Sequence, residues 1–153
     1  MLAVACTSGS EAKVEVRDSA TVQADTEKAS SRVLEMLGLK GKATEAGAQI
    51  APCSGYAEDE RVYRAHHPWS VYGVPFADMQ KAMDRLRGEL PRNGWRITKD
   101  GVDGSIAKSP QIVAESSGRE FAVDVRLQKA SPNESNPRDF IEVTTESACF
   151  KKK

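Results

Sequence analysis

The stretch FAVDVRLQ, residues 121–128, decides the fold, because apolar and polar side chains alternate from Val123 to Gln128. One parity is apolar throughout and consists of Phe121, Val123, Val125 and Leu127. The other parity includes Asp124 and Arg126. Successive side chains of a strand point to opposite faces, so the pattern predicts a strand with one buried and one solvated face. Such strands are typical of antiparallel sheets.

Further extended segments surround this strand. WRITKD (95–100), SIAKSPQIVAESS (105–117) and FIEVTTESAC (140–149) are separated by turn-forming residues, and consecutive strands of this kind usually pair. ERVYRAHHPWSVYGV (60–74) is also predicted to be extended. Its Pro68 has no N–H to donate, which predicts an edge position or a bulge.

Two segments have helical periodicity. VPFADMQKAMDRLRGELPRNG (74–94) carries an apolar stripe made of Phe76, Met79, Met83, Leu86 and Leu90. DTEKASSRVLEMLGLKG (25–41) carries a shorter stripe and is predicted to be capped by Asp25 or Thr26. We therefore predict a single α+β domain over residues 25–150. It should contain one antiparallel sheet of four to five strands, with both helices packed on one face.

The N-terminal segment has a different composition. Residues 6–24 are rich in Ser, Thr, Ala and charged side chains and show no sustained hydrophobic period. This composition predicts a flexible tether, since it buries too little surface to offset chain entropy. VEV at 14–16 is too short to count as a predicted strand.

Composition excludes some classes of function. The chain has 153 residues, and its 22 basic residues balance 22 acidic ones. No basic cluster is present, so the sequence predicts no nucleic-acid partner. No apolar run reaches the roughly 18 residues of a membrane-spanning helix. We expect one modest core and no bound cofactor.

Motifs for catalysis or metal binding are not found in the sequence. His66 and His67 are adjacent, so on a strand they face opposite sides and do not grip one metal together. Asp100 and Asp103 are three residues apart, and no Glu follows at the twelfth position of a calcium loop. GxSxG, P-loop and GxGxxG motifs are all missing. We predict no catalytic residue and no metal site.

LAVAC, residues 2–6, has the pattern of a lipobox. Val4 and Ala5 occupy the two positions before Cys6 as in lipoprotein signal peptides, whereas Ala3 stands where those peptides have Leu, Val or Ile. With the polar segment that follows, the chain resembles small secreted bacterial lipoproteins of the actinobacterial type, a class without a transferable activity. The resemblance implies a diacylglyceryl group on the Cys6 thiol and anchoring at the extracytoplasmic face of the cell membrane.

The same resemblance makes residues 1–5 the remnant of a signal peptide. A complete signal peptide has a basic region and 7 to 15 apolar residues, so we expect the DNA upstream of Met1 to encode them, unless the sequence was trimmed. The alternative is that Cys6 is an unmodified cysteine in a frayed chain end.

The export that this resemblance implies bears on the two other cysteines. Lipid would consume Cys6 and leave Cys53 and Cys149 as an even pair in a compartment where disulfides persist. Cys53 precedes the first long strand and Cys149 ends the last one. We predict a disulfide between them, the alternative being two buried free thiols.

HHPWSVYGVPF concentrates three aromatic side chains, Trp69, Tyr72 and Phe76. They form a possible ligand surface, or else the packed junction of a strand and a helix. We predict a non-catalytic binding module for an unknown protein, wall polymer or small ligand. The alternative is a secreted enzyme with a dispersed active site. A deep pocket holding a histidine near a carboxylate would favour the enzyme, and a shallow polar sheet face would favour the binding module.

Overall fold

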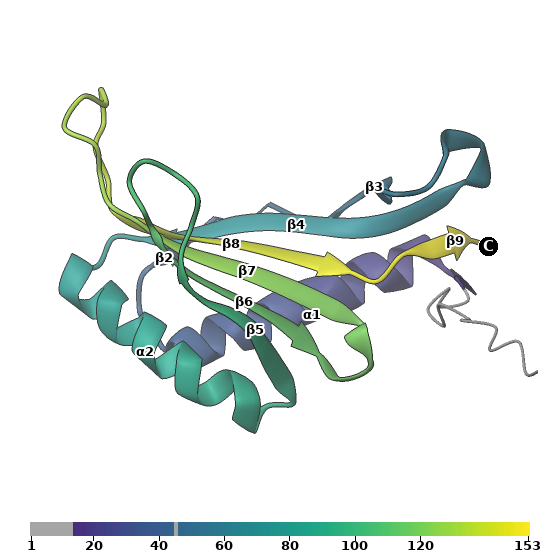
Figure 1. Cartoon of the computed structure of the whole chain (residues 1–153), viewed down its shortest axis with the longest axis horizontal. Helices are drawn as coiled ribbons and strands as arrows, with labels where there is room; N and C mark the ends of the chain where they lie inside the picture. The colour runs from purple at the N-terminus through teal and green to yellow at the C-terminus, as the bar shows by residue number, and fades with distance from the viewer. Residues whose placement is uncertain (1–13, 45) are drawn as a thin grey trace, which may run out of the picture.

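The computed structural model describes residues 14–44 and 46–153, which form two α-helices packed on a mixed sheet of nine strands (Figure 1). The helices are α1 (Ser19–Leu37) and α2 (Phe76–Arg92). The strands are β1 (Glu15–Arg17), β2 (Lys42–Ala43), β3 (Gln49–Pro52), β4 (Val62–Tyr72), β5 (Trp95–Val102), β6 (Pro110–Ser116), β7 (Phe121–Gln128), β8 (Phe140–Ser147) and β9 (Phe150–Lys152). Short 3₁₀ turns lie at Glu58–Glu60 and Ser117–Arg119.

The sheet is larger than predicted and is not purely antiparallel. Its order is β1-β9-β4-β8-β7-β6-β5, and β2 and β3 pair with β4 outside this path. β1 runs parallel to β9, whereas every other pair is antiparallel. The α+β class is confirmed, but the antiparallel sheet of four to five strands is wrong. The added strands β1, β2, β3 and β9 have only two to four residues each, too few to show a period in the sequence.

Both helices cover the same face of the sheet, as predicted. The main core consists of buried side chains of α1 and α2 packed against the side chains of β4 to β8 that point toward the helices. Val123, Val125 and Leu127 of β7 are buried there, which confirms the prediction that this strand has one buried face. From α2 come Met79, Met83, Leu86 and Leu90 of the predicted stripe.

The N-terminal boundary of the domain differs from the prediction. α1 begins at Ser19, and its cap is Asp18, whose Oδ2 accepts a hydrogen bond from Thr21 N at 3.0 Å. Val22 is fully buried in a small second core with Ala65 and Phe150. Residues 15–24 are therefore folded and do not belong to a tether, and the domain does not start at 25. Residues 1–13 lie outside the described part.

The start of α1 was hidden in the sequence because its buried side is partly polar. Thr26 and Ser30 occupy positions between the buried Val22 and Val33. The Thr26 hydroxyl donates to Val22 O at 2.7 Å, which satisfies the buried group inside the helix. Hydroxyl side chains on the inner face interrupt the apolar period from which helix boundaries are predicted.

Pro68 lies in β4, a central strand, although proline has no N–H to donate to a neighbouring strand. Its position in β4 does not require that donor. Ser70 directs its backbone groups toward β2, since its O accepts from Thr44 N and its N donates to the Thr44 hydroxyl, both at 3.0 Å. The backbone of Pro68 points the same way, two residues earlier. β4 pairs with β3 only as far as His66, and its pairing with β2 begins at Val71. The nitrogen of Pro68 therefore faces a gap between β3 and β2, where no strand needs an N–H donor.

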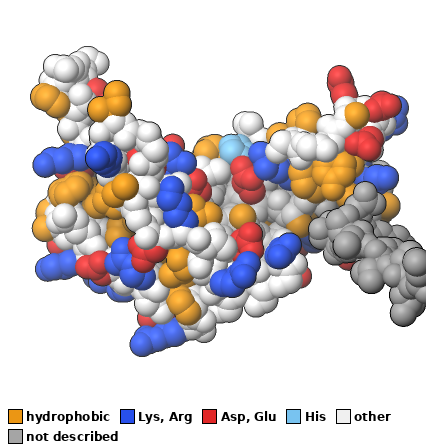
Figure 2. Space-filling model, viewed as in Figure 1, with side chains coloured by type: hydrophobic (Ala, Val, Ile, Leu, Met, Phe, Trp, Pro, Cys, Tyr) orange, Lys and Arg blue, Asp and Glu red, His pale blue; other side chains and the backbone are white. Residues whose placement is uncertain are grey.

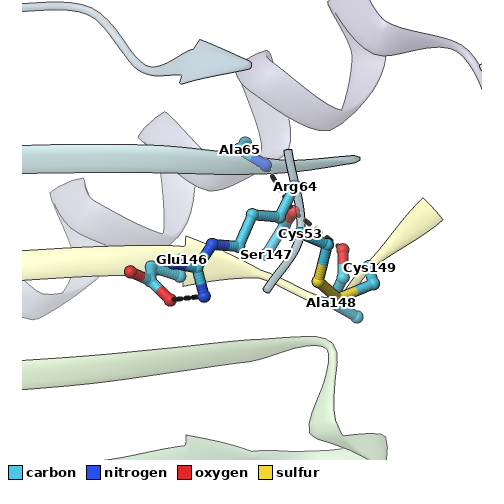
Figure 3. The surroundings of a disulfide bond; sticks show 7 residues. All are labelled: Cys53, Arg64, Ala65, Glu146, Ser147, Ala148 and Cys149. Atoms are coloured by element: carbon cyan, nitrogen blue, oxygen red, sulfur yellow. Dashed lines mark hydrogen bonds and ion pairs between the residues drawn. A yellow bond between two sulfur atoms is a disulfide. The ribbon is translucent and has the colours of Figure 1, made fainter. Parts of the chain in front are cut away.

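A disulfide joins Cys53 and Cys149, as predicted (Figure 3). The two Cα atoms lie 5.9 Å apart, within the range that a bridge requires. Cys53 is held beside β4 by its N–H, which donates to Val62 O at 2.9 Å. The bridge therefore ties the β3–β4 connection to the link between β8 and β9.

Candidate functional site

The outer face of the sheet, which the helices leave uncovered, carries the candidate site. It is formed by those side chains of β4, β6, β7 and β8 that point away from the helices. The strand register aligns side chains in rows across it, one of them running Val113, Asp124, Thr144, Pro68 and the next Glu115, Ala122, Glu146, His66. In Figure 2, acidic and basic side chains are interspersed with uncharged ones on this side of the molecule. The surface is polar and shallow.

Glu146 of β8 is the centre of one ion-pair group on this face. Its Oε2 lies 2.7 Å from Arg64 Nη1, and its Oε1 lies 2.9 Å from His66 Nδ1 (Figure 3 shows the Arg64 contact). Both partners come from β4, which pairs directly with β8. All three side chains are roughly one quarter to two fifths exposed, so a ligand has access to them.

Asp124 of β7 is the centre of a second group. Arg126 donates to both of its oxygens, from Nε at 3.1 Å and from Nη2 at 3.0 Å, and Gln111 Nε2 donates at 3.0 Å. Burial raises the pKa of Asp124, but the hydrogen bonds from Arg126 and Gln111 outweigh it, and the pKa lies below its usual value. The hydrogen bond to Asp124 raises the pKa of Arg126. Both groups are therefore charged at neutral pH.

Asp103 connects this group to the β5–β6 loop. Its Oδ1 accepts hydrogen bonds from Ser105 Oγ at 2.5 Å, Ser105 N at 3.1 Å and Ser109 N at 3.0 Å. These bonds, the one from the Ser105 side chain foremost, lower the pKa of Asp103. Its Oδ2 lies 3.4 Å from Arg126 Nη1. The loop is thus braced against the outer face.

A hollow of about 240 Å³ separates the two ion-pair groups. Asp124 and Glu146 flank it, and Val113, Ala122 and Thr144 contribute its smaller side chains. Each carboxylate already has a cationic partner, so the hollow presents balanced polar groups around a small apolar floor. Such an arrangement can hydrogen-bond a polar ligand laid on the sheet, but it lacks an activated nucleophile.

A second hollow, of about 260 Å³, lies on the helix side, where α1 meets β4 and the segment from β2 to β3. His67 lines it, with Nδ1 2.7 Å from Ser30 Oγ and Nε2 2.5 Å from Ala46 O. A carbonyl oxygen only accepts, so Nε2 carries a hydrogen, and in that tautomer Nδ1 accepts from the Ser30 hydroxyl. Ser30 and His67 are both buried. The arrangement fits a satisfied core histidine.

The three predicted aromatic residues do not share one surface. Trp69 is buried in the core and lines the His67 hollow. Tyr72, of the opposite parity, lies under Arg138, whose guanidinium carbon is 4.0 Å from the ring centre. Phe76 begins α2 and packs against the core, with Lys129 Nζ 5.5 Å from its ring centre. Most of their contacts are those of a packed strand–helix junction.

Sequence reasoning missed most of the residues on the outer face. The alternation of β7 marked Asp124 and Arg126 as outward-facing, but gave no reason to single them out. The pairing of Glu146 with Arg64 and His66 spans 80 or more residues, and no local pattern indicates it. Cys6 lies outside the described residues. His66 and His67 do face opposite sides of the sheet, as expected.

Within residues 14–44 and 46–153, no group of three or more His, Cys, Asp or Glu side chains is arranged to hold a metal ion. None of the helices described there is long and apolar enough to cross a membrane. Searches against protein-family models, curated proteins and solved structures found no match to this chain.

Proposed function

We propose that this protein is an extracytoplasmic lipoprotein, anchored to the membrane by lipid on Cys6, whose domain binds a polar ligand on the outer face without catalysis. The LAVAC pattern supports the anchor. The disulfide between Cys53 and Cys149 supports the location, because such bonds persist outside the reducing cytosol.

The observation that carries the binding function is the shallow outer face with its two ion-pair groups. The histidine that meets a carboxylate is His66, and it does so on the open sheet rather than in a deep pocket. His67 lies in a pocket, but its partners are a hydroxyl and a carbonyl. This distribution favours a binding module over an enzyme.

The ligand that suits this face is polar and laid flat across β7 and β8. Arg126 and Arg64 offer N–H donors, Asp124 and Glu146 offer acceptors, and Thr144 adds a hydroxyl between them. Fragments of a wall polymer combine hydroxyl, amide and carboxylate groups and match this mixture. A protein segment of similar polarity is the other ligand class for this face.

Binding is tested by NMR titration of the full chain with soluble wall-polymer fragments. We expect saturable shifts at the amides around Ala122, Asp124 and Glu146, and their loss in Ala122→Arg, which fills the hollow. The matched control is Ala77→Arg, at an exposed position on α2. Shifts confined to the His67 pocket, or equal loss in both variants, would contradict the outer face as the binding site.

The anchor is tested separately in cells that express the gene together with the DNA upstream of Met1. We expect Cys6→Ser to abolish labelling by a palmitate analogue and to remove the lipid-modified form from the membrane fraction. Labelling that persists in this variant would contradict lipidation at Cys6.

A secreted enzyme is the second candidate, and the contact between Ser30 and His67 is the observation that favours it. A serine that donates to a histidine resembles a nucleophile and its general base. Steady hydrolysis of p-nitrophenyl acetate that Ser30→Ala abolishes, with the variant still folded, would establish this alternative over the binding module.

A further inference from the structure

We infer that the hollow between the C-terminal end of α1 and the face of α2 is a binding site for a small anion, of the phosphate or phosphate-ester class. This hollow is separate from the outer face and from the His67 pocket. It has a volume of about 290 Å³ and is lined by Gly38, Leu39, Lys40, Val74, Asp78, Lys81 and Arg85. The inference does not depend on the lipid anchor or on the proposed ligand.

Arg85 is the fixed cation of this site. Its Nε and Nη2 donate to Leu37 O, the last carbonyl of α1, at 3.0 and 2.8 Å. Gly38 follows in the left-handed region, with φ of 64°, and a Cβ built there would lie 2.7 Å from Arg85 Nε. The guanidinium therefore rests against bare backbone in one orientation. Its Nη1 makes no hydrogen bond to any described residue.

Lys81 and Lys40 provide two more positive charges. Lys81 precedes Arg85 by four residues on α2, so the two side chains share one face of the helix. A like-charge pair at this spacing slightly destabilises a helix. No carboxylate of the described chain lies within 4 Å of Lys40, Lys81 or Arg85. An anion held among the three would offset their repulsion.

The remaining lining residues set the size and polarity of the ligand. Leu39 and Val74 supply an apolar wall that fits the organic part of an ester. Asp78 also lines the hollow, three residues before Lys81, and its carboxylate opposes a second negative group. The site therefore suits one compact anion rather than a polyanion.

The test uses inorganic phosphate as the probe. The full chain, labelled with ¹⁵N, is titrated at pH 7.5 with sodium phosphate while sodium chloride keeps the ionic strength constant. We expect saturable shifts at the amides of residues 38–40 and 78–85. Lys81→Met and Lys40→Met should each weaken phosphate binding by about fivefold, because each removes a charge next to the anion. Asp78→Asn should strengthen it.

Lys28→Met is the matched control, since Lys28 is an exposed lysine in the middle of α1. The Lys28→Met variant should bind phosphate as tightly as the unchanged protein does. Lys81→Arg keeps the positive charge that Lys81→Met removes, so it should retain binding. Shifts that do not saturate, or an equal loss in Lys28→Met, would overturn the site and indicate general screening. Because this experiment omits wall-polymer fragments, its failure does not affect the binding function proposed for the outer face.

Discussion

Cys53 and Cys149 are brought to a Cα separation of 5.9 Å although they are 96 positions apart in the sequence. Their bridge closes most of the domain into one loop, and a cross-link of this span restricts the unfolded chain strongly in the chain-entropy model. It also holds the segment before β4 against the segment before β9, so it fixes a corner where β1, β3 and β9 are only three or four residues long.

Loss of this bridge should destabilise the protein. We expect the double variant Cys53→Ser, Cys149→Ser to lose about 2–4 kcal/mol of unfolding free energy, measured by urea denaturation. A reducing agent should shift the midpoint of the unchanged protein similarly and leave that of the double variant alone. Mass spectrometry of unreduced protein should show no alkylation at either cysteine, and alkylation of both would contradict the bridge.

Val22 tests whether the chain before residue 25 belongs to the fold. Because Val22 is fully buried with Ala65 and Phe150, Val22→Ala should cost about 1–2.5 kcal/mol in thermal or urea unfolding. Val16→Ala is the control, since the Val16 side chain is mainly exposed on β1, and it should change stability by under about 0.5 kcal/mol. Equal, small effects would restore the interpretation of this segment as a tether.

Ser30 and Ser31 form a matched pair for the buried hydrogen bond to His67. Ser30→Ala leaves Nδ1 of His67 without its donor inside the protein, so we expect a loss of about 1–3 kcal/mol. Ser31→Ala removes an exposed hydroxyl that only bonds Glu27 O, and should cost under about 0.5 kcal/mol. Urea denaturation of both variants measures the difference, and equal losses would argue against the buried bond.

The lowered pKa values of Asp124 and Asp103 predict the direction of acid sensitivity. A carboxyl group whose folded-state pKa lies below its unfolded value contributes stability above the unfolded value of 3.8, and that contribution disappears as pH falls through the folded-state pKa. Asp124→Asn should therefore flatten the fall in unfolding midpoint between about pH 5 and pH 2. Asp84→Asn, at an exposed site, serves as the control and should leave the acid profile nearly unchanged.

Long periodic segments could be predicted from the sequence, whereas short ones could not. β7 and α2 show clear periods of two and 3.6 residues, and both were placed within two residues of their ends. β1, β2 and β3 depend on partners far along the chain, and local composition does not record such pairing. The polar Thr26 and Ser30 on the buried side of α1 concealed its start.

The candidate site was harder to predict than the fold, because its residues meet only through strand register. Glu146 belongs to a run of alternating residues in which each polar position looks equivalent. Its distinction is that β4 places Arg64 and His66 beside it. The disulfide was the exception, since the export and the lipidation of Cys6 that the resemblance implies left only one pair of cysteines.

The parallel pairing of β1 with β9 has a consequence for the order in which the protein folds. A chain made on a ribosome or threaded through a membrane emerges from its N-terminus, so β1 and the first turns of α1 leave first. Their partners, Phe150 in the small core and Lys151 beside Val16, emerge more than a hundred residues later. The first segment of the domain to emerge is therefore the last to find its neighbours, and until then Val22 lacks the contact with Phe150 that it has in the folded protein.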